Sequence, residues 1–148
     1  MKAKDVFARL SDLLRLIRKA NGFRTNAGLS VHFAIQGMPA PEDLTLPAIF
    51  VAMDGLSWDS SQYSRALVTL RFSISGAVAV DSPMGDLLDL AWDIRAACSA
   101  DGAFAGLLHG ANAVQFSEAR FQLPENGNNL AEVSQPVSFT FAEHYKVN

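Results

Sequence analysis

The stretch RALVTLRFSISGAVAV, residues 65–80, decides the fold. Its apolar residues recur at every second position: Ala66, Val68, Leu70, Phe72, Ile74, Val78 and Val80. A period of two is typical of a strand with one buried face, because successive side chains point to opposite sides. At about 3.3 Å per residue such a strand is roughly 50 Å long. We therefore expect it either to bend, at Gly76, or to project beyond the core.

Two shorter strands are predicted before this stretch. Apolar and polar residues alternate over 29–36, which indicates a half-buried strand. Residues 48–53 are apolar on both faces, which favours a central strand. The prolines between these two strands indicate a loop over 37–47. Asp54-Gly55 is expected to begin a second loop that runs to about Gln62.

Two more strands are predicted in the second half of the sequence. The first begins at Val114, and the parity of its apolar positions changes near Ser117–Glu118, which indicates a bulge. The segment PENGNN, residues 124–129, is typical of a polar turn. The last strand covers 133–147, where the large apolar residues have odd numbers. Pro136 has no N–H for a ladder, so we expect this strand to be bulged or at an edge there.

Two amphipathic helices complete the predicted fold. Residues 3–21 carry apolar side chains at helical spacing, with Gly22 as a stop signal. Asp81-Ser82-Pro83 is typical of a helix start, with a capping residue and then proline at the first helical position. The second helix has an apolar stripe of Leu87, Ala91, Ile94 and Cys98. The fold class is therefore α+β: one mainly antiparallel, twisted β-sheet with two amphipathic helices packed on one face.

Composition predicts a single domain, residues 1–148. Of these residues, 49% are hydrophobic and 18% are charged, which excludes a disordered chain. The net charge of −3 argues against a general nucleic-acid binder. Because Cys98 is the single cysteine, no internal disulfide and no cysteine-based zinc site can form. No apolar run approaches the roughly 18 residues that cross a bilayer. With no secretory signal visible, we expect synthesis and folding in the cytoplasm.

Charge is divided unevenly along the sequence. Residues 1–24 carry seven basic and two acidic side chains, a net charge of +5, whereas the remainder carries five basic and thirteen acidic side chains, a net charge of −8. The first helix then has a solvated basic face, or pairs with the rest of its own chain, or contacts another copy through Arg15 and Arg18. The expected acidic counterpart is on the outer face of the second helix, where three carboxylates fall within about 60° of one another: Asp86, Asp89 and Asp93.

Motifs that carry catalysis are absent. The sequence contains no HExxH, no GxSxG and no glycine-rich phosphate loop. The three histidines, His32, His109 and His144, are far apart and are expected to be solvated. Cys98 lies in an apolar stripe, which predicts a buried and inert thiol. We therefore assign no catalytic, cofactor-binding or metal-binding residue, and an enzyme is left open only if its site is assembled from scattered residues.

Large aromatic side chains are the remaining candidates for a functional surface. Trp58 and Tyr63 fall in or beside the loop expected over 54–62, and Trp92 falls on the flank of the second helix. Aromatic residues at such places are enriched at protein interfaces. The alternative is that each of them folds back onto the core.

Five segments, spread over most of the chain, carry a resemblance to a known family. They are ANGF at 20–23, LPAIFV at 46–51, VTLRFSI at 68–74, DLLDLAWDIR at 86–95, and the closing strand from VSFTF at 137–141 through Tyr145. Together they resemble the tail terminator, or tail completion, proteins of long-tailed bacteriophages, the minor tail protein U-like group.

The resemblance implies a structural role without catalytic residues or cofactors. Such a protein forms a ring, usually a hexamer, on the head-proximal end of the finished tail tube, where it stops tube polymerisation and presents a surface to the neck. The implied partners are further copies of itself, the tail tube protein and the neck or head-completion protein, with DNA only passing through the lumen and no membrane. The implied location is the tail of a phage or prophage virion, made in the cytoplasm of the bacterial host.

The ring gives the acidic residues two alternative uses. Asp86, Asp89 and Asp93 either line the lumen, where carboxylates would repel the duplex and let it slide, or pair with the first helix of a neighbour. Besides the ring protein, two other functions are left open. One is a small soluble module that binds a ligand or peptide against its sheet, and the other is the enzyme without a recognisable motif.

Overall fold

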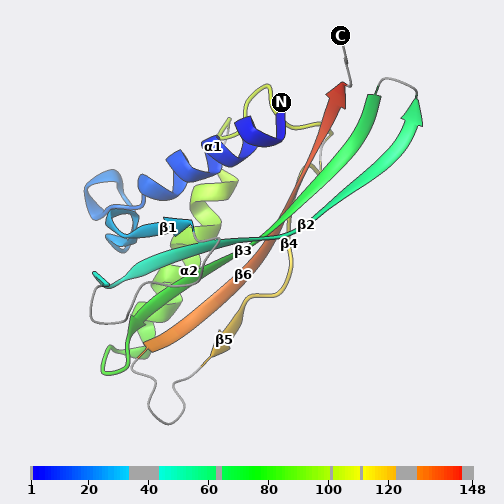
Figure 1. The fold of residues 1–148 in the computed structure, drawn as a ribbon. Coiled ribbons are helices and arrows are strands. Elements are labelled where there is room, and N and C mark those ends of the chain that lie inside the picture. The colour runs from blue at the N-terminus through cyan, green and yellow to red at the C-terminus, as the bar shows by residue number, and fades with distance from the viewer. Residues whose placement is uncertain are drawn as a thin grey trace.

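The computed structural model describes residues 2–33, 44–62, 65–100, 102–110, 112–122 and 130–144 (Figure 1). Its helices are α1 (Lys2–Arg15) and α2 (Met84–Ser99), with short 3-10 helices η1 (Lys19–Asn21) and η2 (Ala27–Leu29). Its strands are β1 (Val31–Phe33), β2 (Ala48–Gln62), β3 (Arg65–Ala79), β4 (Val114–Phe116), β5 (Arg120–Gln122) and β6 (Leu130–His144).

One twisted sheet contains all the strands in the described residues (Figure 1). Its order is β1-β2-β3-β6-β4, and β5 also pairs with β6. Every pairing is antiparallel except that of β1 with β2, which is parallel. The predicted α+β class, with a mainly antiparallel sheet, is therefore confirmed.

The central strand is β3, as the alternation over 65–80 predicts. Its even-numbered apolar side chains from Ala66 to Ile74 are all buried. β3 pairs with β6 along its whole length, from Arg65 opposite His144 to Ala79 opposite Leu130. The strand ends at Ala79, and the Val80 side chain is 53% exposed, so the expectation that Val80 continues the buried face is wrong.

Gly76 serves as a packing position on this long strand. A Cβ atom at Gly76 would lie 2.5 Å from Cδ2 of Leu90, so the glycine lets α2 lie directly on β3. β3 does not project alone, because β2 and β6 have the same length of 15 residues and run beside it. The three strands curve together and extend beyond the part of the sheet that α2 covers (Figure 1).

The two helices pack on the same face of the sheet, as predicted. The ring of Phe7 in α1 lies 6.1 Å, centroid to centroid, from the ring of Phe72 in β3. Leu90 of α2 contacts β3 at Gly76, and both β3 positions have even numbers, so they share one face. Val6, Leu10 and Leu14 of α1 join Leu90 and Ile94 of α2 in a single hydrophobic core with the inner sides of β3 and β6.

The first helix ends earlier than predicted, at Arg15. The reason is tertiary: the chain returns at residues 26–28 and packs against the helix end. The amide of Gly28 donates to the carbonyl of Ile17 at 2.8 Å, and a Cβ at Gly28 would lie 2.6 Å from the Arg15 carbonyl oxygen. Gly22 takes its expected stop role at the end of η1, with φ of 91° and an amide that donates to the carbonyl of Lys19.

The largest error of the sequence prediction concerns β2. The structure has one continuous strand over 48–62 where a short strand and a loop were expected. The register shifts between Met53, which lies opposite Phe72, and Gly55, which lies opposite Arg71, so Asp54 is an extra residue in a β-bulge. The bulge moves the residues on the helix-bearing face from odd to even numbers, which removes the simple alternation. Trp58 therefore lies on a strand, and Tyr63 lies outside the described residues.

The bulge predicted near Ser117–Glu118 is confirmed. Phe116 lies opposite Val137 and Arg120 opposite Ser134, so the β4–β5 side has one residue more than β6. The carbonyl of Pro136 accepts from the amide of Ser117 at 3.1 Å. In an antiparallel strand, the N–H and C=O of one residue point to the same side. The position where Pro136 lacks an N–H therefore faces the bulge between β4 and β5. The proline is thereby accommodated in a central strand.

Candidate functional site

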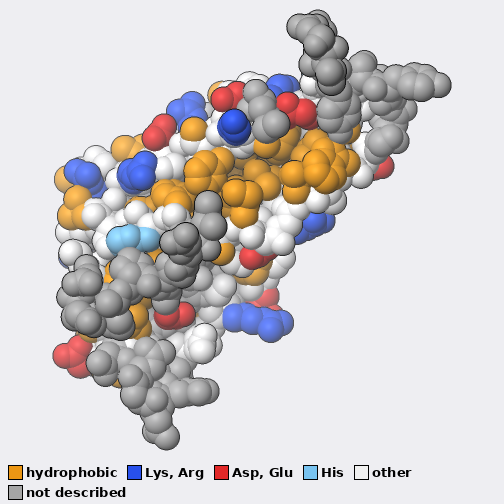
Figure 2. Space-filling model, in the orientation of Figure 1, with side chains coloured by type: hydrophobic (Ala, Val, Ile, Leu, Met, Phe, Trp, Pro, Cys, Tyr) orange, Lys and Arg blue, Asp and Glu red, His pale blue; other side chains and the backbone are white. Residues whose placement is uncertain are grey.

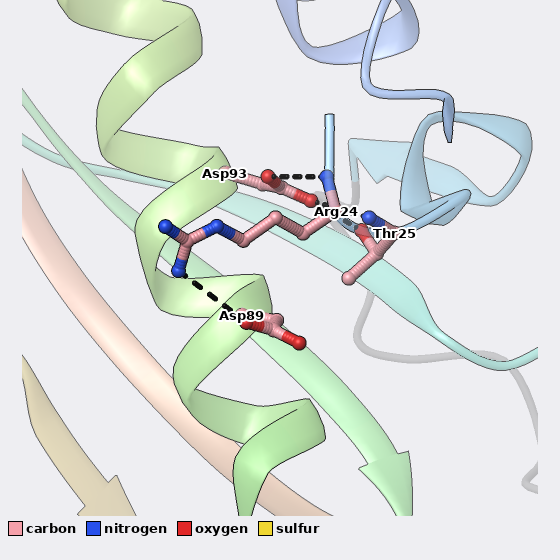
Figure 3. Close-up of polar contacts among 4 residues, drawn as sticks. All are labelled: Arg24, Thr25, Asp89 and Asp93. Atoms are coloured by element: carbon pink, nitrogen blue, oxygen red, sulfur yellow. Dashed lines mark hydrogen bonds and ion pairs between the residues drawn. The ribbon is translucent and has the colours of Figure 1, made fainter. Parts of the chain in front are cut away.

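The acidic residues of α2 do not form the exposed stripe that the sequence predicts. Asp93 is 1% exposed. Its Oδ2 accepts from the amide of Thr25 at 2.8 Å and from the Thr25 hydroxyl at 2.7 Å, and its Oδ1 accepts from the amide of Arg24 at 3.0 Å (Figure 3). Asp93 is thus an internal anchor for residues 24–25. The expectation that Asp93 is exposed is wrong, and both a lumen wall and a contact with a neighbouring copy would need an exposed carboxylate.

Asp89 pairs with the same segment of its own chain. Nη1 of Arg24 lies 3.4 Å from Oδ1 of Asp89, and the two side chains are 51% and 42% exposed (Figure 3). An ion pair as exposed as this one contributes roughly 0–1 kcal/mol to stability. The guanidinium of Arg24 also lies 4.6 Å above the ring of Trp92. Of the alternatives for the basic segment, pairing within the chain is therefore realised through Arg24.

The third carboxylate, Asp86, is exposed at the beginning of α2. It lies on the rim of a hollow of about 280 Å³ that Lys19, Arg24 and Asp89 also line. α2 begins at Met84, with Pro83 at the N-cap position and no side-chain capping bond. The predicted capping by Asp81 or Ser82, with Pro83 inside the helix, is therefore wrong.

The outward face of α2 carries an apolar row, whereas an acidic face was expected. Met84, Leu88 and Trp92 are 76%, 55% and 57% exposed, and their spacing of four residues places them in one row along the helix. We call these three residues the α2 ridge. The physical reason for the error is that residues 24–25 pack beside α2 and draw Asp89 and Asp93 to that flank, which leaves the apolar row outside.

A second apolar row lies on the edge strand β2. Met53, Leu56 and Trp58 are 67%, 41% and 57% exposed. They lie opposite Phe72, Leu70 and Val68, so they share the face of the sheet that carries the helices. We call these three residues the β2 strip. Figure 2 shows a band of hydrophobic side chains that follows the course of β2 below the charged surface of α1.

The backbone beside the β2 strip has no partner strand among the described residues. β1 pairs with β2 only from Ile49 to Val51, and no other described strand pairs with this edge. An edge strand with exposed apolar side chains is a surface for contact with another chain. Trp58 is therefore an exposed surface residue, as the interface hypothesis requires.

The basic candidates lie on and after α1. Nη1 of Arg15 donates to Oγ of Ser11 at 2.7 Å, and the guanidinium lies 5.4 Å above the ring of Phe33. Because Phe33 lies opposite Val51 in the sheet, Arg15 flanks the Met53 end of the β2 strip. Arg18 is exposed beyond the end of α1. Within the described part of the chain, neither arginine forms an ion pair with α2.

No helix of the described residues covers the opposite face of the sheet, which carries polar side chains and, at one end, a small apolar cluster of Ala48, Phe50, Ala77 and Leu130. A hollow of about 360 Å³ on this face is lined by side chains that include Asp54, Thr69, Arg71, Gln115 and Thr140. Asp54 accepts a hydrogen bond from Ser73, and Nη1 of Arg71 donates to Oγ of Ser57 at 3.2 Å. At one end of this face, His32 stacks on Phe50 with ring centroids 5.3 Å apart. His32 is thus partly covered and not fully solvated.

The groups that could perform chemistry are placed as follows. Cys98 is buried, as predicted, and burial raises the pKa of its thiol to about 12. His109 and His144 are exposed. Within the ranges that the structure describes, no three His, Cys, Asp or Glu side chains converge to hold a metal ion. None of the helices in these ranges is long and apolar enough to span a membrane.

Sequence reasoning missed four of the six residues in the two apolar rows. The signal for the α2 ridge was present, since Met84, Leu88 and Trp92 recur at a spacing of four. The signal for the β2 strip was hidden by the bulge at Asp54.

In comparison with known proteins, no family model matches the sequence and no curated protein is significantly similar to it.

Proposed function

We propose that this chain is a structural subunit of a phage or prophage tail, a tail terminator that forms a ring, a hexamer in the family it resembles. The ring would cap the head-proximal end of the tail tube, stop tube polymerisation and offer the neck its joining surface. The observation that carries the proposal is the exposure of two apolar rows, the β2 strip and the α2 ridge, on a subunit whose core is otherwise filled. Exposed apolar patches of this kind mark protein contacts.

Two further features support an assembly role. α2 carries an exposed apolar row, the α2 ridge, in addition to its buried side, and an exposed row of this kind is a surface for a contact. The two rows also belong to different elements, so a contact between them would join unlike surfaces. Contacts between unlike surfaces generate closed rings when the rotation closes. The proposed location is the virion tail, and the proposed partners are further copies, the tube protein and the neck protein, with DNA only passing through.

The test uses the tube protein from the genome that encodes this chain. Tubes are polymerised with and without the purified protein and measured by electron microscopy. We expect shorter tubes with a ring at one end, because a cap removes the growing surface. The double variant Trp58→Ala/Trp92→Ala should lose this effect, whereas Phe121→Ala, which removes an aromatic side chain that is 48% exposed outside both rows, should retain it. Unchanged tube lengths and tubes without rings would refute the proposal.

The alternative is a small module that binds a ligand or peptide against its sheet. The feature that favours it is the polar hollow of about 360 Å³ on the helix-free face, where Arg71 and Asp54 offer charges of both signs. A protein that stays monomeric at all concentrations and binds a small molecule or peptide with a loss of affinity in Arg71→Ala would favour this alternative over the ring.

A further inference from the structure

The β2 strip and the α2 ridge correspond to each other in composition and length. The strip contains Met53, Leu56 and Trp58, and the ridge contains Met84, Leu88 and Trp92. The strip lies opposite residues 68–72 of β3, four strand steps that cover roughly 13 Å, and the eight helical steps of the ridge cover roughly 12 Å. One row can therefore cover the other along nearly its whole length.

The charges beside the two rows differ in sign at one end. Arg15 flanks the Met53 end of the strip, where its guanidinium lies over Phe33. The Met84 end of the ridge has Asp81 and Asp86, both exposed. At the other end of the ridge, two arginines lie over aromatic rings: Arg24 over Trp92 and Arg95 over Phe116, each at 4.6 Å. These charges favour one orientation, with Met53 near Met84 and Trp58 near Trp92.

We propose that the β2 strip of one copy packs on the α2 ridge of the next copy, with Arg15 facing Asp86. The contact is heterologous: each subunit offers its strip to one neighbour and its ridge to the other. This inference rests on the proposed ring, in which the strip and the ridge of each subunit are covered by two different neighbours. Covering both rows removes all six side chains from water and excludes the β2 edge from other strands.

Cysteine cross-linking tests the contact directly. Cys98 is buried with a thiol pKa raised to about 12, so introduced cysteines are the reactive ones. Met53→Cys and Met84→Cys replace side chains that are 67% and 76% exposed, so both variants should fold. A short bismaleimide is added to each single variant, to their mixture and to the double variant. The protein concentration is one at which native mass spectrometry detects oligomers, or the highest attainable if it detects none.

The expected result is a cross-linked dimer in the mixture, a ladder of multimers in the double variant, and no product in either single variant. A control mixture of Met53→Cys with Phe121→Cys should give no product. Efficient linking within Met53→Cys alone would show a two-fold contact and overturn the inference. Absence of product from the mixture would also overturn it, whether or not oligomers are present.

The outcomes for the contact and for the proposed function can be separated. Rings that form without this cross-link would refute the contact and leave the tail terminator standing. Cross-linked rings that leave the length of tail tubes unchanged would refute the tail terminator and leave the contact standing.

Discussion

Thr25 is held to Asp93 by both its amide and its hydroxyl, at 2.8 Å and 2.7 Å from one carboxylate oxygen. The amide of Arg24 adds a third bond to the other oxygen. This junction attaches the segment between η1 and η2 to the middle of α2 and decides which side of α2 faces outward. The apolar ridge is therefore a consequence of a polar contact on the neighbouring flank.

Replacing Asp93 with alanine should destabilise the fold. Hydrogen bonds to a charged group contribute about 1.5–3 kcal/mol each, and the substitution leaves buried donors without partners. We expect a loss of about 3–5 kcal/mol in the free energy of unfolding, measured by urea denaturation. The exposed carboxylate of Asp86 is the matched control: Asp86→Ala should change the free energy of unfolding by less than about 0.5 kcal/mol. Equal effects of the two substitutions would contradict the anchor role.

Gly76 should be intolerant of a side chain. A Cβ there would lie 2.5 Å from Cδ2 of Leu90, so Gly76→Ala forces α2 away from β3. Overpacking of this kind costs about 1–3 kcal/mol, which thermal or urea unfolding would reveal. Gly85→Ala is the control, since nothing lies within 4 Å of a Cβ at that position of α2. It should be neutral or stabilise by up to about 1 kcal/mol.

Deleting Asp54 should be tolerated. Without the extra residue, Leu56 and Trp58 follow Met53 at the second and fourth positions, so all three keep the same face without a bulge. We expect the free energy of unfolding to fall by less than about 2 kcal/mol, mainly because the hydrogen bond to Ser73 is lost. Deleting Ser57 instead leaves the bulge in place and turns Trp58 to the other face of the sheet. This deletion should lower the free energy of unfolding by more. A larger loss for the Asp54 deletion, in parallel urea titrations, would argue against this position of the bulge.

Charge reversal should reveal the orientation of the subunit contact. Arg15→Asp places like charges together and should weaken self-association about tenfold, a difference of about 1.4 kcal/mol. In a heterologous contact, adding Asp86→Arg to the same chain restores the pair and should recover association. Sedimentation at low and moderate salt measures both effects. Arg120→Asp, an exposed charge on β5, should have no effect, and failure of the second change to rescue the first would contradict the pairing.

The thiol of Cys98 should be unreactive in the folded protein. Burial raises its pKa to about 12, so almost no thiolate exists at pH 8, and the thiolate is the nucleophile. Because the folded pKa lies above that of an unfolded cysteine, the stabilisation from the neutral thiol is present below about pH 8.5 and is lost as the pH rises toward 12. A thiol reagent should react in urea but not in buffer at pH 8. Rapid labelling of the native protein would show that the site opens.

The sequence was sufficient where one local pattern controls the structure. The alternation in β3 predicts its face and length, and the parity change after Phe116 predicts the bulge that accommodates Pro136. It was insufficient where contacts between residues far apart in the sequence determine the structure. Asp54-Gly55 has the composition of a turn, and only pairing with β3 keeps β2 extended through it. The three carboxylates of α2 were grouped correctly, but whether they face solvent depends on Thr25.

The pairing of β3 with β6 sets an order of events during synthesis. β3 is made well before β6, because α2, β4 and β5 lie between them in the chain. A nascent chain that stops short of Leu130 has the apolar side of β3 but lacks the strand that pairs with it from Ala79 to Arg65. Such long-range pairing is slow to form. Folding should therefore follow translation of β6, and ribosome-bound chains that end before Leu130 should stay sensitive to protease.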